Sequence, residues 1–188
     1  VFSFEVGLVI LASGIFFIWN RALAAPDTYL YLTLLDSEGT ILIQTPGKKA
    51  VLIGGGASPS HLNHMLGQFL PPGGHVMDVV FVGSNMKDDL NALSGGLKKM
   101  PENMVLWCGD PEYNQTTEAA FEAFGNVGIV INPLEAGQVL EMGDAITLEV
   151  LWLGERGSVF WLSWGDFSAL LPAGKVEGHW MESPNAPD

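Results

Sequence analysis

The sequence predicts an α/β domain in which helices pack on a mixed β-sheet, preceded by one transmembrane helix. The first observation is an apolar stretch at residues 2–19, which has the length and composition of a membrane span. The second is a set of β-rich runs at residues 29–53, followed by alternating strand and helix patterns up to residue 131. The third is a return to strand patterns at residues 138–171. This order is typical of a mixed sheet with helices packed on it.

The apolar stretch matches a membrane span in detail. It holds 18 residues with a single charge, Glu5. A helix of this length is roughly 27 Å long, which nearly matches a hydrocarbon core of about 30 Å. Trp19 stands where an interfacial aromatic residue is expected, and Arg21 follows it. We therefore expect residues 1–22 to form a membrane anchor, with these side chains in or beside the bilayer: Phe2, Phe4, Leu8, Ile10, Phe16, Phe17, Trp19 and Arg21.

Two questions about this segment stay open. The run Ala22-Leu23-Ala24 resembles a signal-peptidase site, so a cleaved signal peptide competes with a retained anchor. The apolar stretch lacks a preceding basic region, which favours the anchor. Arg21 is the only basic residue that closely flanks the span, and the positive-inside tendency then places the domain in the cytoplasm. We expect a single-pass protein of the bacterial inner (cytoplasmic) membrane with a cytoplasmic domain.

Composition and charge limit the number of domains and the classes of partner that we expect. The 188 residues have room for one domain beside the anchor, which we place at residues 28–175, followed by an irregular tail at residues 176–188. Eight basic and 21 acidic residues give a formal charge of −13. Such a surface repels phosphate backbones, so we expect no nucleic-acid partner. The single cysteine, Cys108, excludes an internal disulfide.

Periodicity and turn signals place the elements of the domain. Helices are expected at residues 58–70, 88–100 and 117–124. The last two strands are expected to form a hairpin over Gly165-Asp166. Strands are expected at residues 29–35, 40–44, 50–53, 77–82, 104–107, 128–131, 138–141, 146–153, 158–164 and 167–171.

Several segments in order resemble one known fold. LLDSEGTILIQTP at residues 34–46 and VLIGGG at residues 51–56 are similar to the opening strands and loop of the metallo-β-lactamase fold. The strand at residues 79–82 and AGQVLEMGD at residues 136–144 continue the similarity, which spans residues 31–174. Among its members the chain resembles most the hydrolase-like C-terminal domain of bacterial competence DNA-uptake channels. The resemblance implies a truncated αββα fold, because the family's closing strands and helices have no counterpart.

The resemblance also implies that the metal site is degenerate. The family's His-x-His-x-Asp-His cluster falls on Ser84, Met86, Asp88 and Asp89, and its metal-bridging aspartate falls on Gly174. A hydroxyl is too weak a zinc ligand and a thioether too soft, so these positions cannot hold the metals. Asp88 and Asp89 suit the start of a helix, where carboxylates accept hydrogen bonds from free N–H groups. We therefore expect no metal, no cofactor and no catalytic residue.

Other candidate residues have a simpler explanation. His61 and His64 lie three residues apart on one predicted helix and could face one partner, but exposed histidines are more common. The glycines at residues 54–56 lack the spacing of a phosphate-binding loop and indicate a tight turn. His75 and His179 stand alone in the sequence, and Cys108 has no basic neighbour that would activate its thiol. We expect a solvated acidic face that contains Asp110, Glu112, Glu118 and Glu122.

The sequence thus predicts that the chain is not an enzyme. We expect an anchored accessory or structural subunit of a larger membrane protein complex, with a pseudo-hydrolase domain as its docking surface and with other membrane subunits and the lipid bilayer as partners. Photosynthetic and respiratory assemblies are plausible hosts. Two alternatives stay open: a metal-dependent hydrolase or nuclease, and the C-terminal part of a DNA-uptake channel. The usual placement of that channel's domain, outside the cytoplasmic membrane, disagrees with the orientation that Arg21 indicates.

Overall fold

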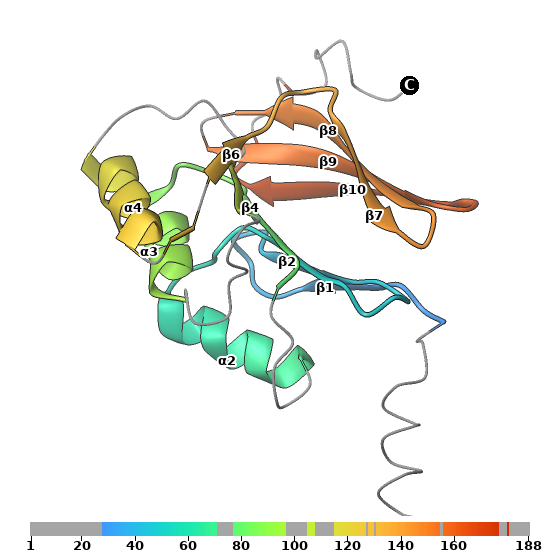
Figure 1. Cartoon of the computed structure of the whole chain (residues 1–188), viewed down its shortest axis with the longest axis horizontal. Helices are drawn as coiled ribbons and strands as arrows, with labels where there is room; N and C mark the ends of the chain where they lie inside the picture. The colour runs from blue at the N-terminus through green and yellow to red at the C-terminus, as the bar shows by residue number, and fades with distance from the viewer. Residues whose placement is uncertain are drawn as a thin grey trace, which may run out of the picture.

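A computed structural model describes residues 28–70, 77–96, 105–107, 115–126, 128–129, 131–154, 156–176 and 180. Two sheets stack face to face, and helices cover the outer side of one of them (Figure 1). The six-stranded sheet has the order β1 (Tyr31–Leu34), β2 (Ile41–Gln44), β3 (Ala50–Ile53), β4 (Val79–Val82), β5 (Val105–Trp107) and β6 (Ile131–Pro133). The four-stranded sheet has the order β10 (Phe167–Gly174), β9 (Gly157–Trp164), β8 (Ile146–Leu153) and β7 (Val139–Gly143).

Connection type decides strand direction in each sheet. Short turns join β1 to β2 and β2 to β3, so these strands are antiparallel. Helices α2 (Pro59–Phe69), α3 (Lys87–Gly95) and α4 (Gln115–Asn126) fall between successive strands from β3 to β6, and those strands are parallel. The four-stranded sheet is antiparallel throughout. The alternation of elements predicted a mixed sheet, and the resemblance implied two sheets with helices outside them; the structure has a mixed sheet and a second, antiparallel one.

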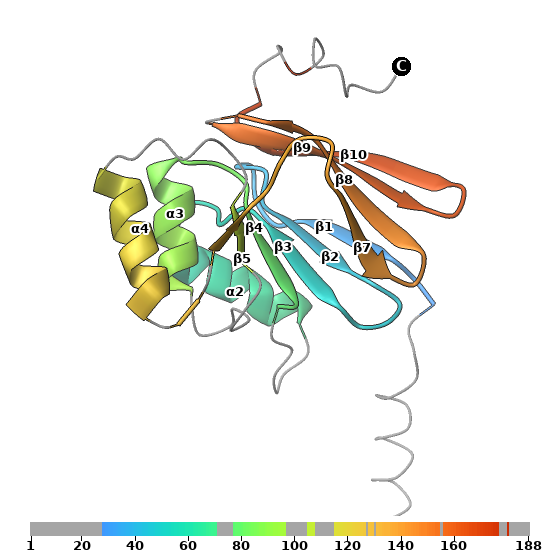
Figure 2. The ribbon, with the colours of Figure 1, turned by 45° about the horizontal axis from the view of Figure 1, so that its top comes forward.

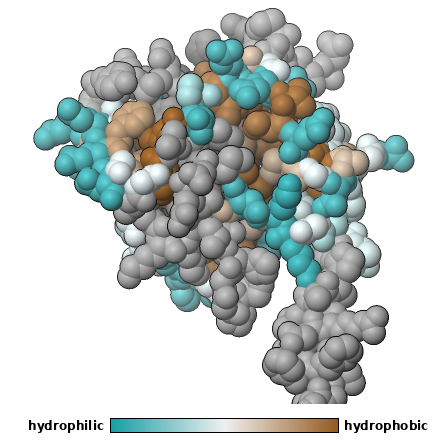
Figure 3. Space-filling view, in the orientation of Figure 1, coloured by the Kyte–Doolittle hydropathy of each residue, from teal (hydrophilic) through white to brown (hydrophobic). Residues whose placement is uncertain are grey.

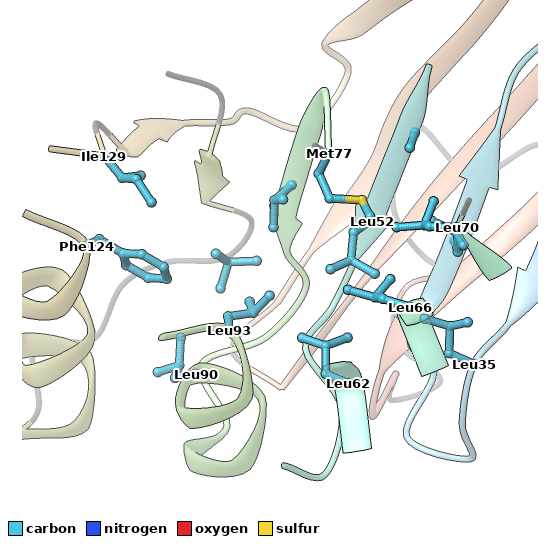
Figure 4. Close-up of a cluster of buried hydrophobic side chains, with 14 of the residues drawn as sticks. Leu35, Leu52, Leu62, Leu66, Leu70, Met77, Leu90, Leu93, Phe124 and Ile129 are labelled. Atoms are coloured by element: carbon cyan, nitrogen blue, oxygen red, sulfur yellow. The ribbon is translucent and has the colours of Figure 1, made fainter. Parts of the chain in front are cut away.

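The alternation of side chains along each strand builds two cores. In β2, Leu42 faces the helices, whereas Ile41 and Ile43 face the four-stranded sheet. The first core lies between the six-stranded sheet and the helices. Figure 4 shows Leu90 and Leu93 of α3 there, between Phe124 of α4 and the α2 leucines Leu62 and Leu66. The second core lies between the two sheets, which Figure 2 shows stacked on one another. There the rings of Phe81 and Phe160 meet edge to face, with their centroids 5.3 Å apart. The central strands are therefore buried on both faces.

The helix α2 begins as its sequence indicates. The Ser58 side chain accepts a hydrogen bond from the His61 amide at 3.3 Å, and Pro59 occupies the first turn, where a missing N–H does no harm. Leu62 and Leu66, one turn apart, are buried against the sheet.

Three predicted boundaries were wrong by three residues or more. The helix predicted at residues 88–100 ends at Gly95, with Gly96 as its C-cap, because glycine favours helix termination. The strand predicted at residues 128–131 begins only at Ile131, after Gly128 at a φ of 78°. The last strand continues past Leu171 to Gly174, and Pro172 is tolerated because β10 is an edge strand.

Several predictions lie outside the described residues. These are the membrane anchor at residues 1–22, the side chains of His75, Cys108, Asp110, Glu112 and His179, and most of the tail at residues 176–188. In the part of the chain that the structure describes, no helix is long and apolar enough to cross a membrane.

Candidate functional site

The candidate site lies at the carboxyl ends of β3 and β4. These strands are parallel neighbours, so the loops that follow them meet at one edge of the sheet. The amide of Gly54 donates to the Phe81 carbonyl at 2.9 Å and joins the two loops. Between the loops is a pocket of about 10 Å³, room for about one water molecule. Its lining contains all five positions that the sequence singled out, Ser84, Met86, Asp88, Asp89 and Gly174, together with Glu38 and Gly56.

Asp89 is the centre of this arrangement. One carboxylate oxygen accepts hydrogen bonds from the amides of Gly55 and Gly56, at 2.6 and 2.8 Å. The other accepts from the Ser84 hydroxyl at 2.8 Å. Asp89 is buried in the first turn of α3, and the predicted role of accepting from helix-start amides was wrong: its amide donors come from the glycine loop. The side chain thereby fixes the loop after β3 to the helix after β4.

The glycine loop is shaped to receive that carboxylate. A Cβ at position 55 would collide with the backbone carbonyl of Asp89 and lie 2.6 Å from Leu93 Cγ. Gly54 and Gly56 have φ of 82° and 80°, a conformation that residues with a side chain rarely adopt. The sequence predicted a tight turn here; the structure has an irregular loop instead, and the loop's amides at positions 55 and 56 converge on one acceptor.

Burial dominates the electrostatics of Asp89. Loss of solvent raises the pKa of its carboxyl above the ordinary value, and the nearby Asp36 carboxylate raises it further. The hydrogen bonds from Gly55, Ser84 and Gly56 stabilise the charged form and lower the pKa, but they offset only part of the effect of burial. The native state therefore holds the Asp89 proton more tightly than the unfolded chain does.

Gly174 closes the opposite side of the pocket. Its φ is 72°, and a Cβ there would lie 2.6 Å from the Arg156 carbonyl oxygen and 3.2 Å from Ser84 Cβ. The same stretch of β10 approaches the β1–β2 turn so closely that a Cβ on Gly39 would be 2.9 Å from the Gly174 amide. The backbone thus leaves no space at position 174 for an aspartate side chain.

Two supporting residues were missed from sequence. Asp36 accepts from the amides of Glu38 and Thr40 and from the Thr40 hydroxyl, and shapes the turn beside Gly56. The residues Asp36-Ser37-Glu38-Gly39 are typical of a turn, but the sequence does not show which groups Asp36 binds. The buried Ser158 hydroxyl donates to the Gly83 carbonyl at 2.9 Å and joins β9 to the loop after β4. No local pattern could indicate that contact, because 75 residues separate the two.

The residues of the pocket do not fit a pair of metal ions. The Ser84 hydroxyl donates to Asp89, three hydrogen bonds already occupy the Asp89 carboxylate, and Gly174 has no donor atom. The Met86 thioether is a poor ligand for zinc. Across the described ranges, no three or more His, Cys, Asp or Glu side chains are arranged to hold a metal ion. His61 and His64 are exposed on α2, outside the pocket lining, and Glu118 and Glu122 are exposed on α4.

Comparison with known proteins gives a similarity of structure and none of sequence. The sequence matches no protein-family model and no curated protein. The structure is similar to that of the metallo-beta-lactamase fold protein YhfI from Bacillus subtilis, with a TM-score of 0.48 and 14% sequence identity. The match covers 76% of this chain and 58% of that one, so the chain spans less than two thirds of that protein's length. What the structure itself defines is an α/β domain of two stacked sheets with one layer of helices.

Proposed function

We propose that this chain is a non-catalytic relative of the metallo-β-lactamase fold proteins, anchored in a membrane and serving as an accessory or structural subunit of a larger membrane complex. The single observation that carries this proposal is the hydrogen-bond set of Asp89. A ligand carboxylate must present free lone pairs to a cation, whereas three of the roughly four lone-pair sites of this one accept from Gly55, Gly56 and Ser84. The Asp89 carboxylate instead links the loop after β3 to the loop after β4.

The geometry around Gly174 supports the same conclusion independently. A metal-bridging aspartate would need a side chain directed into the pocket, and the backbone there excludes even a Cβ. A hydrolytic two-metal centre also needs an open coordination position for water or substrate. The space between the loops holds about one water molecule, which leaves no room there for a pair of cations.

The proposed membrane anchoring is supported by the apolar residues 2–19. The proposed accessory role combines this anchor with a domain that has no catalytic site. A domain without chemistry is retained for what it binds, so its surface is the functional part. Purification of the full chain from native membranes in mild detergent tests this role. We expect other membrane proteins to copurify in fixed ratio, identified by mass spectrometry; recovery of the chain alone would contradict the proposal.

Metal analysis tests the absence of catalysis. The full chain in mild detergent is equilibrated with Zn²⁺ or Mn²⁺, freed of excess metal and analysed by elemental mass spectrometry. We expect less than one ion per chain, unchanged in the Asp88→Asn variant. One or two ions per chain, lost in that variant and accompanied by hydrolytic turnover, would overturn the proposal.

A metal-dependent hydrolase is the second candidate, favoured by one observation. Glu38 and Asp88 line the pocket with Asp89, and both side chains are exposed. Carboxylates alone favour hard cations such as Mn²⁺ over zinc. The Mn²⁺ arm of the experiment therefore decides between the two functions.

A further inference from the structure

The described domain has two ends of different chemistry. Asp36, Glu38, Asp88 and Asp89 gather around the pocket, at the carboxyl ends of β3 and β4. The opposite end of the six-stranded sheet is formed by the starts of β1, β3 and β4, because Tyr31, Gln44 and Ala50 are register partners across β1, β2 and β3. We call this second end the aromatic end.

Three large, exposed rings lie at the aromatic end. Tyr29 is 64% exposed, Tyr31 46% and Phe69 41%. The two tyrosine rings are 6.3 Å apart. Gln44, the cross-strand partner of Tyr31, donates to the Phe69 carbonyl at 3.3 Å, which places the end of α2 beside the same edge of the sheet. These three side chains account for half of the six exposed large hydrophobic residues in the described ranges.

The aromatic end carries lysines as well as acidic side chains. Lys48 and Lys49 occupy the β2–β3 turn there. Asp78 accepts from the Ala50 amide, and Asp144 accepts from the Gly47 amide in the same turn. The formal charges of these four side chains cancel, although the chain as a whole carries −13. Of the two ends, this one can approach an anionic surface without strong repulsion.

The chain itself brings a membrane to this end. Arg21 closes the proposed anchor, and eight residues later Tyr29 begins the aromatic end. Eight residues can extend no more than about 29 Å, so a membrane that holds the anchor stays within reach of β1. Figure 2 shows the start of β1 at the far end of the six-stranded sheet from α3 and α4. Tyrosine side chains, with an apolar ring and a polar hydroxyl, are enriched where a protein meets lipid headgroups.

We propose that the domain rests on the lipid surface through Tyr29, Tyr31 and Phe69, so that the acidic pocket end faces away from the membrane. This inference rests on the proposed anchoring by residues 2–19. The occupant of the aromatic end is the headgroup layer of the bilayer. The hydrophobic surface that Figure 3 shows over the four-stranded sheet is separate from it, and none of the three ring residues belongs to that sheet.

Spin-label accessibility tests the orientation. In a Cys108→Ser background, nitroxides are attached to Gln68→Cys, beside Phe69, and to Glu38→Cys, on the pocket end; both native side chains are exposed. The full chain is reconstituted into phosphatidylcholine vesicles, and collision rates with oxygen and with a water-soluble nickel chelate are measured. We expect the chelate to collide several-fold less often with the label at position 68 than with the label at position 38. Replacing Tyr29, Tyr31 and Phe69 with serine should remove the difference while the chain stays in the vesicles.

The outcomes separate this inference from the proposed anchoring. Vesicles that retain the chain but leave both labels equally accessible would overturn the orientation and keep the anchor. A chain that does not float with the vesicles would overturn both. Protection of position 68 in native membranes, but not in lipid vesicles, would show that a protein covers the aromatic end and would overturn the lipid contact.

Discussion

Asp89→Ala removes the acceptor on which the loops after β3 and β4 converge. Three donors lose their partner: the buried amides of Gly55 and Gly56 and the Ser84 hydroxyl. Each unsatisfied buried donor lowers the free energy of unfolding by about 1–3 kcal/mol. Removal of the buried Asp89 carboxylate also removes the cost of burying its charge, which offsets part of the total loss. We expect a loss of roughly 3 kcal/mol or more in the free energy of unfolding.

Asp89→Asn is the matched control. Its amide oxygen can still accept from both glycine amides, and its NH₂ can donate to the Ser84 oxygen after the hydroxyl rotates. The loss should then be about 1 kcal/mol or less. Urea unfolding of the full chain in mild detergent, followed by tryptophan fluorescence, measures both values. Equal losses in the alanine and asparagine variants would refute the argument that the carboxylate acts as a hydrogen-bond acceptor for these loops.

The pKa of Asp89 adds a dependence on pH. Because its native pKa is raised above the unfolded value of about 3.9, the stability that proton binding provides is fully present below that value. It is lost as the pH rises through the native pKa. The unfolding free energy of the wild-type chain, relative to Asp89→Asn, should therefore fall with increasing pH from about 4 upward. A difference that rises with pH would show that the hydrogen bonds outweigh burial.

Three further predictions follow from the same geometry. Ser84→Ala leaves one Asp89 oxygen without its donor, so we expect a loss of about 1–2 kcal/mol in urea unfolding and a higher Asp89 pKa, visible as a pH dependence shifted to higher pH. Gly55→Ala should destabilise strongly because its Cβ meets the Asp89 carbonyl, whereas Gly67→Ala, with open space inside α2, should stabilise by about 0.5–1 kcal/mol; similar effects at both positions would contradict the packing described. Gly174→Asp should not create a zinc site and should lower the unfolding free energy by about 1–2 kcal/mol or more, because its φ is positive and the Arg156 carbonyl is 2.6 Å from the new Cβ; stoichiometric zinc in that variant would count against the closed pocket.

Much of the local structure could be predicted from the residues. The strands β3 and β8 match their predicted ranges, and the helix predicted at residues 58–70 is α2, with Ser58 as its N-cap. These elements follow from alternation of apolar side chains and from capping chemistry, both of which act over a few residues. The resemblance to a known fold also singled out five positions, and the structure places all five around one pocket. Predictions failed where a boundary depended on a neighbour, as at Pro172, which is tolerated because β10 has no further strand on its outer side.

By itself, then, the sequence determined where strands and helices form and that the positions expected to bind metal carry unsuitable side chains. Only the tertiary structure decided which hydrogen bonds hold these positions together. The bonds from Gly55 and Gly56 to Asp89 span 34 and 33 residues, and the contact between Ser158 and Gly83 spans 75. Such partners are fixed by how two sheets and a helix pack, because burial then forces each polar group to satisfy its hydrogen bonds with whatever the fold has brought near.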